Sequence, residues 1–162
     1  MTTPADRDQP LSMQQLAATV PIALGQSDPV LVTQEMVDRH AATTGDEQWI
    51  HNDPERARRE SPFGGPVVQG FLLLALLTRL SGGLVFPPFG AVSMLVNYGF
   101  ERVRFVRPVP VGASVQLRGV LSEVRPRGDG SAVLVVDVEL RVAGGPDRPC
   151  VAAQWLFLAV PA

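Results

Sequence analysis

An almost uninterrupted apolar run near the middle of the sequence constrains the fold most. Residues 67–80 are apolar on nearly every face of a helix, and Gly82-Gly83 follow them closely. Such a pattern is typical of a helix buried on all sides, and paired glycines are typical of a helix end. The run is shorter than the roughly 20 residues that a membrane span needs. We therefore expect a core helix.

Strands are predicted for most of the chain after this helix. Segments rich in Val, Leu and Phe extend over 92–106, 114–125, 132–143 and 151–160, with Pro/Gly turns between them. A further short strand is expected at Val30-Leu31-Val32. The simplest assembly of these parts is an α+β fold, in which an antiparallel sheet of about five strands wraps around one buried central helix.

Capping signals place shorter helices before the apolar run. Thr33 is a good N-cap for a helix over 34–43 that Gly45 ends, and Asp53-Pro54 begin another that extends to Glu60. A short helix over 12–18 is also plausible. The first ten residues are polar and contain two prolines, so we expect a flexible N-terminus and a single domain over residues 11–162.

Composition and charge argue against several classes of function. The formal net charge of -2 and a pI near 5.6 give no basic surface for nucleic acid. All 14 basic residues are Arg, which excludes a lysine Schiff base. The lone Cys150 lies in an apolar run and is expected to be buried rather than nucleophilic. With no disulfide, signal-peptide pattern or membrane span, we expect a cytoplasmic protein without a membrane partner.

The residues with the clearest chemical potential lie between the predicted helices. Asp46 and His51 are five residues apart in a loop, where they can converge on one point. Together they supply a base that can hold a water and a group that exchanges protons near neutral pH. Spacing alone equally allows a capping role for Asp46 and a structural role for His51.

Several motifs together resemble the MaoC-like family of (R)-specific enoyl-CoA hydratases and dehydratases. They occur in the order and with the spacing of that family over about residues 27–160. The motifs are Gly45-Asp46-x-x-x-x-His51, Asp53-Pro54-Glu55-Arg56-Ala57, Pro62-Phe63-Gly64, the apolar helix headed by Gly70, Asn97-Tyr98-Gly99, Val103-Arg104-Phe105 and Pro108-Val109-Pro110-Val111-Gly112.

The resemblance implies a hot-dog fold, whose overhanging helical loop segment bears Asp46 and His51 above the end of the central helix, usually at a dimer interface. Asp46 would orient and deprotonate water, and His51 would share the water and handle the proton at the neighbouring carbon. The N-H of Gly70 would stabilise the enolate-like oxygen of a thioester. The expected reaction needs no metal or organic cofactor, and His40 makes no ligand spacing with the loop.

The resemblance also predicts the substrate and its contacts. An acyl-CoA or an acyl-carrier-protein thioester is expected as substrate, and a homodimer as the assembly. The residues expected to bind substrate are Gln48, Trp49, Phe63, Gly65 and Gln69. For Trp49 and Phe63, packing of the loop against the core is an alternative role.

Three departures from the family's pattern leave other functions open, and one of them is Gln48, which stands where many hydratases have an asparagine. Gln69 stands where close members have a histidine before the helix glycine, and Ala75 stands where they often have a serine. A glutamine can donate and accept hydrogen bonds but cannot carry a proton at neutral pH. The alternatives are a hot-dog thioesterase and a dehydratase or cyclase of specialised metabolism that acts on a polyketide-like chain.

Overall fold

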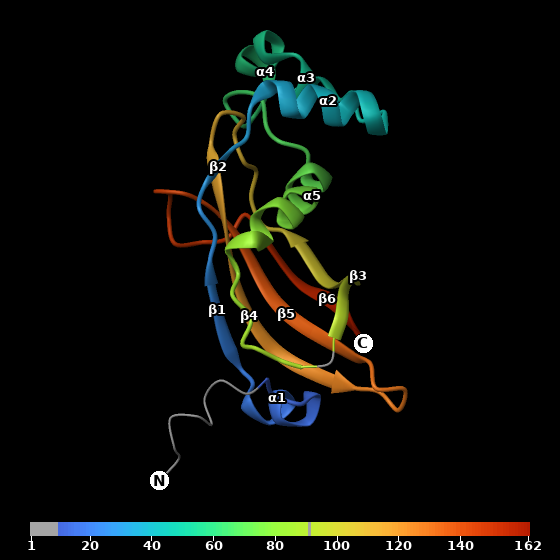
Figure 1. Ribbon diagram of the computed structural model, residues 1–162. Coiled ribbons are helices and arrows are strands. Elements are labelled where there is room, and N and C mark those ends of the chain that lie inside the picture. Colours follow the sequence, from blue (N-terminus) through green and yellow to red (C-terminus); the bar gives the residue numbers. More distant parts are fainter. Residues whose placement is uncertain (1–9, 91) are drawn as a thin grey trace.

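A computed structural model describes residues 10–90 and 92–162 of the chain (Figure 1). The predicted flexible segment therefore lies almost wholly outside the described residues. The helices are α1 (Met13–Thr19), α2 (Gln34–Thr44), α3 (Trp49–Asn52), α4 (Pro54–Glu60) and α5 (Gly70–Leu80), followed by a 3-10 turn over Ser81–Gly83. The strands are β1 (Ile22–Gln26), β2 (Val30–Leu31), β3 (Val92–Phe105), β4 (Ser114–Pro126), β5 (Ala132–Val142) and β6 (Val151–Pro161).

All the strands belong to one antiparallel sheet. Its order is β1-β4-β5-β6-β3, and the short β2 pairs with β4 beyond the end of β1. Figure 1 shows this sheet curving around α5. The strands predicted from Val and Leu content agree closely with β3 to β6. The prediction missed β1, whose five residues are bent by a bulge at Gly25 (φ 87°).

The central helix packs its leucines against the concave face of the sheet. These buried leucines are Leu72, Leu73, Leu76, Leu77 and Leu80. Partners in the same apolar core include Leu117, Leu121, Leu134, Leu140 and Trp155 from β4, β5 and β6. Burial of this apolar surface is the main stabilising contribution that the fold provides.

The expectation of a helix over 67–80 that is buried on every side is wrong in two respects. The helix begins at Gly70, because Val67 and Val68 are extended and hydrogen-bond to the 109–110 segment. Its other face is also open in the single chain, with Phe71 70% exposed and Ala75 and Thr78 exposed. The sheet covers one side of the helix only.

The overhanging segment forms one end of the molecule. Figure 1 shows α2, α3 and α4 together beyond the sheet, on the side from which the chain enters α5. The side chain of Thr33 accepts a hydrogen bond from Met36 N and caps α2, and that of Asp53 accepts one from Arg56 N and caps α4. Both predicted caps are confirmed. The single turn of α3 is too short to give a periodic signal in the sequence.

Truncation of Leu77, which is fully buried in the core, tests this packing. We expect Leu77→Ala to lower the free energy of unfolding by about 2–5 kcal/mol, because it leaves a cavity between α5 and the sheet. The neighbouring Thr78→Ala, on the exposed face of the same helix, should change it by less than about 0.5 kcal/mol. Urea unfolding measures both, and equal losses would contradict the one-sided burial of α5.

Candidate active site

The loop that carries Asp46 is shaped by a left-handed glycine. Gly45 has φ 78° and its N-H donates to Ala41 O at 2.8 Å, which ends α2. Residues 45–48 then lead into α3, and Asp46 lies in this turn with a half-buried side chain. The Asp46 carboxylate therefore lies just before α3 and five residues before His51 in the sequence. His51 belongs to α3, so it lies in a helix and not in a loop as the sequence suggested.

The ring of His51 is held by a main-chain carbonyl. The side chain is only 8% exposed, and Nδ1 lies 2.5 Å from Val67 O. Because a carbonyl oxygen only accepts, the hydrogen must be on Nδ1. In the neutral ring, Nε2 therefore has a free lone pair that can take a proton. This arrangement suits general acid/base work.

Two amide side chains connect this region to α2. Gln34 Nε2 donates to His51 O and to Asp38 Oδ1, each at 2.8 Å. Gln69 is 1% exposed, and its Nε2 donates to Val37 O at 3.1 Å. The predicted substrate-binding residue Gln69 is thus enclosed between α2 and the start of α5, whereas Gln34 carried no signal in the sequence.

A hollow of about 410 Å³ lies beside the first residue of α5. Gly70 lines it together with Phe63, Phe71, Phe105 and Arg107, among others. The ring of Phe105 packs so closely on Gly70 that a Cβ there would lie 2.9 Å from the ring. Free N-H groups at a helix start and apolar walls are suited to a polar group at the end of an apolar ligand.

Arg107 contributes a buried cation to this hollow. Its Nε and Nη2 atoms are buried and make no hydrogen bond with the part of the chain that the structure describes. These two donors point the same way on a guanidinium and form its two-pronged edge. Phe105 belongs to one of the motifs that resemble the family, but the sequence did not assign it to the site.

A second hollow of about 680 Å³ adjoins the first across Phe63. Gly64, Gly65 and Pro66 form one wall, and Gln34 and Arg58 contribute from α2 and α4. Gly64 adopts φ 76°, which allows the tight turn before the extended 67–69 segment. The predicted residues Phe63, Gly65 and Gly70 therefore lie around two neighbouring hollows at the start of α5.

The other predicted residues lie outside both hollows. Asp46, Gln48, Trp49, His51 and Gln69 line neither of them in the single chain described here over residues 10–90 and 92–162. The Arg56 guanidinium lies 4.3 Å from the centre of the Trp49 ring, a cation-π contact that supports a packing role. Gln48 precedes α3 without a side-chain capping bond.

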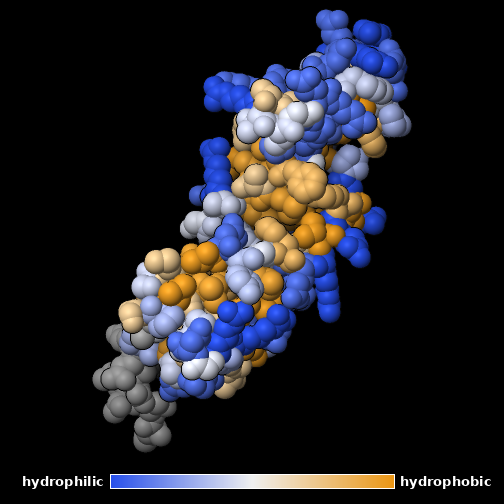
Figure 2. Space-filling view, turned by 90° about the vertical axis from the view of Figure 1, so that its right-hand side faces the viewer, coloured by the Kyte–Doolittle hydropathy of each residue, from blue (hydrophilic) through white to orange (hydrophobic). Residues whose placement is uncertain are grey.

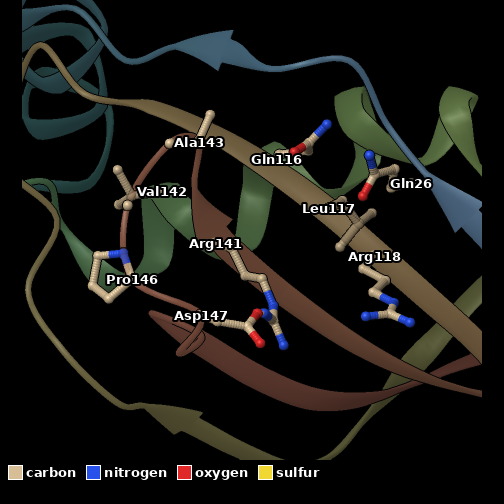
Figure 3. Close-up of a pocket in the computed structure, with 11 residues that line it drawn as sticks. Gln26, Gln116, Leu117, Arg118, Arg141, Val142, Ala143, Pro146 and Asp147 are labelled. Carbon is tan, nitrogen blue, oxygen red and sulfur yellow. The ribbon is translucent and has the colours of Figure 1, made fainter.

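Figure 3 shows a different hollow, beside the sheet rather than at the start of α5. It has a volume of about 240 Å³ and lies by β1, β4 and the 143–147 turn. There Arg141 forms ion pairs with Glu139 and Asp147. None of the residues expected to catalyse the reaction or bind substrate lines this hollow, so it is not the candidate site.

Three further observations concern the rest of the described chain. Within residues 10–90 and 92–162, no group of three His, Cys, Asp or Glu side chains is arranged to hold a metal ion. No helix in the same residues has the length and apolarity of a membrane span. Cys150 is fully buried as predicted, and burial raises the pKa of its thiol, which disfavours the nucleophilic thiolate.

The curved sheet around one helix and the overhanging segment define a hot-dog protein, and comparison with known proteins gives its family. The model of the MaoC like domain matches residues 16–143. The chain belongs to this family. Both the predicted fold and the predicted class of enzyme, a hydro-lyase, are confirmed by this match and by the relatives below.

Two curated proteins and one solved structure illustrate the relationship. 3-Hydroxyacyl-thioester dehydratase Z of Mycobacterium tuberculosis is 43% identical over 141 residues, 87% of this chain and 91% of that protein. Nodulation protein N of Rhizobium meliloti is 38% identical over 150 residues, 92% and 91% of the two chains. The (R)-hydratase from A. caviae involved in PHA biosynthesis superimposes with a TM-score of 0.63 at 24% identity, covering 85% and 96% of the chains.

Substitution of Gly70 tests the geometry of the hollow. In Gly70→Ala the new methyl group should turn the half-exposed Phe105 ring into the hollow, and the free energy of unfolding should change by less than about 1 kcal/mol. Crystal structures and thermal melts of the variant measure both effects. Gly82→Ala is the control, since nothing lies within 4 Å of its Cβ position. An unmoved Phe105 ring would contradict the close packing described here.

Proposed function

We propose that this protein reversibly hydrates a 2-enoyl thioester to a 3-hydroxyacyl thioester, with Asp46 and His51 as the acid/base pair. The main observation in support is the hydrogen bond from His51 Nδ1 to Val67 O, which leaves Nε2 free to exchange a proton. The 43% identical relative, a 3-hydroxyacyl-thioester dehydratase by name, supports the choice of substrate.

Asp46 and His51 act together on one water molecule and move one of its protons. Asp46 orients the water and accepts its proton as the water oxygen bonds to C3, while His51 shares the water through Nε2. Together they move that proton to C2, so that the elements of water are added across the double bond. The reverse sequence removes water from the 3-hydroxyacyl thioester. A carboxylate and an imidazole suffice for this exchange, as is usual in general acid/base catalysis.

The start of α5 stabilises the charge that develops on the thioester oxygen. Gly70 is the first residue of this 11-residue helix, and its N-H has no partner within the helix. That N-H and the positive end of the helix dipole favour the enolate-like oxygen. The hollow beside Gly70 is lined largely by apolar side chains, so a bound acyl thioester would displace water from it and strengthen the interaction.

The open face of α5 offers a path for the acyl chain. Phe71, Ala75 and Thr78 are exposed along this face. It ends at an apolar cavity of about 370 Å³ that Thr78, Trp155 and Phe157 line with other residues. Figure 2 shows hydrophobic side chains gathered along the middle of this side of the molecule. Such a surface can hold an alkyl chain that extends from a thioester at Gly70.

Removal of the acid/base groups is the direct test. Asp46→Asn keeps the shape but removes the base, and kcat should fall by about 10²–10⁴ with the fold intact. His51→Ala should be similarly damaging, and the double variant should be little worse than either single variant because both residues act on one water. Loss of the conjugated enoyl absorbance of crotonyl-CoA measures hydration. Near-normal turnover by Asp46→Asn would refute the mechanism.

The same assay separates hydration from thioester hydrolysis. Free thiol, measured in parallel, appears only if water attacks the carbonyl rather than C3. Release of free thiol, with the C2–C3 double bond retained in the released acid, would favour the thioesterase alternative. The acyl carrier, whether CoA or a carrier protein, and the cytoplasmic location stay predictions.

We also propose that the active form is a homodimer. β3 is 14 residues long, pairs only with β6 among the described strands, and leaves Met94, Tyr98 and Phe105 exposed. An unpaired, apolar edge of this length favours pairing with another strand. Since Asp46 and His51 do not line the hollow beside Gly70 in one chain, a second chain would close the site around the substrate.

Light scattering tests the assembly. A stable dimer is expected at micromolar concentration. Phe105 and Tyr98 on β3 are exposed, so a Tyr98→Glu variant should weaken association by placing a charge in the interface. The control is Arg118→Gln, an exposed residue of β4 three strands from β3, which should leave association unchanged. A wild-type monomer at that concentration would contradict the proposal.

A further inference from the structure

Val67 O, which accepts the hydrogen bond from the His51 ring, lies in a segment that three hydrogen bonds hold in place. Val67 N donates to Ile50 O at 3.0 Å, and Val68 N donates to Val109 O at 2.8 Å. The third bond comes from the Gln69 side chain, which donates to Val37 O of α2 at 3.1 Å. The position of Val67 O, and with it the ring of His51, therefore depends on α2 as well as on the neighbouring backbone.

Helix α2 also binds the main-chain carbonyl of His51. Gln34 lies one turn before Val37 on the same face of α2, and its Nε2 donates to His51 O at 2.8 Å. Asp38 Oδ1 accepts a second bond from the same amide at 2.8 Å, which fixes the amide's orientation. One helix is thus joined by two glutamine amides to the backbone of His51 and to the segment that orients its ring.

We infer that Gln69 and Gln34 are positioning residues for His51, and that Gln69 is not a ligand of the substrate. This inference rests on the proposed role of His51 in the hydration. Gln69 is 1% exposed and lines neither hollow at the start of α5. A substrate could reach it only after α2 moved away from α5.

The orientation of the Gln69 amide supports this role. Val37 O can only accept, so Nε2 must face it, and Oε1 is left buried with no hydrogen-bond partner in the described residues. An unpartnered buried acceptor is unfavourable, and an apolar side chain of similar size would avoid it. The hydrogen bond from Nε2 to Val37 O is therefore the contact that explains a glutamine at position 69.

This role also accounts for the departure at position 69. A histidine, as the resemblance leads one to expect at this position, has a ring N-H that can donate to Val37 O in place of the amide. Neither residue needs to carry a proton in the reaction for this purpose. The exchange of one for the other therefore leaves the acid/base pair unchanged.

Nitrogen-15 NMR of the histidine rings tests the inference without turnover. The chain has two histidines, His40 and His51, so a His40→Gln variant assigns the signals, and His40 then serves as an internal reference. In the wild type, the Nδ1 signal of neutral His51 should be that of a protonated nitrogen. In Gln69→Leu and Gln34→Leu it should shift toward the other tautomer, while the His40 signals stay in place.

Kinetics with the enoyl thioester supply the second measurement. Both leucine variants should lose about 10- to 100-fold in kcat, because a displaced catalytic ring is costly, with KM changed less than about threefold. Gln69→His should restore the His51 tautomer and kcat to within about threefold of the wild type. Gln116→Leu is the matched control, since Gln116 donates to Ser27 O at 2.6 Å from β4, and it should leave both readings unchanged.

The outcomes separate the possible roles. Unchanged His51 signals and kcat in Gln69→Leu, with a raised KM, would show that Gln69 binds substrate and would overturn the inference. If Gln69→Leu does not fold, Gln34→Leu, whose side chain is only half-buried, decides the matter through the same signals. If the wild-type protein has no hydratase activity but the His51 signals still shift in the leucine variants, the positioning role is upheld and the proposed function is refuted.

Discussion

The extended segment from Pro66 to Gln69 connects the parts of this protein. Its backbone pairs with Ile50 in the overhanging segment and with Val109 and Val111 before β4. Because these bonds hold the segment extended, α5 begins at Gly70, which lines the hollow beside Phe105 and whose N-H has no partner within the helix. The same segment presents Val67 O to His51. One short stretch thus sets the geometry of both Gly70, the proposed charge-stabilising group, and His51, a proposed proton-transferring group.

Local chemistry made much of the fold predictable. The strands β4 to β6 follow directly from Val and Leu content, and α2 follows from its Thr33 cap and the glycine that ends it. Elements whose form depends on distant partners were not predictable. The bulged β1 is a strand because β4 pairs with it, and 67–69 is extended because 109–111 binds it, although the apolar pattern suits a helix equally well.

The candidate site was predictable only to the extent that it lies in motifs close in the sequence. Asp46, His51 and Gly70 were singled out in this way and stay predictions, whereas the contact of Phe105 with Gly70 joins residues far apart in the chain. Gln34 contacts His51 across 17 positions and has no motif of its own. Gln69 was singled out as a departure from the family's pattern, and its burial and its bond to Val37 suggest what it does.

Helix α5 has more apolar residues than the sheet of the single chain covers. Its leucines account for the face that the sheet covers, yet Phe71 remains 70% exposed, and β3 beside the sheet edge exposes Met94 and Leu95 as well. Large adjoining apolar surfaces are uncommon on stable monomers and usually mark binding sites. The expectation of burial on every side is thus wrong for the single chain, in which the sheet covers one face of α5. The proposed acyl chain and the proposed second chain would cover the other face.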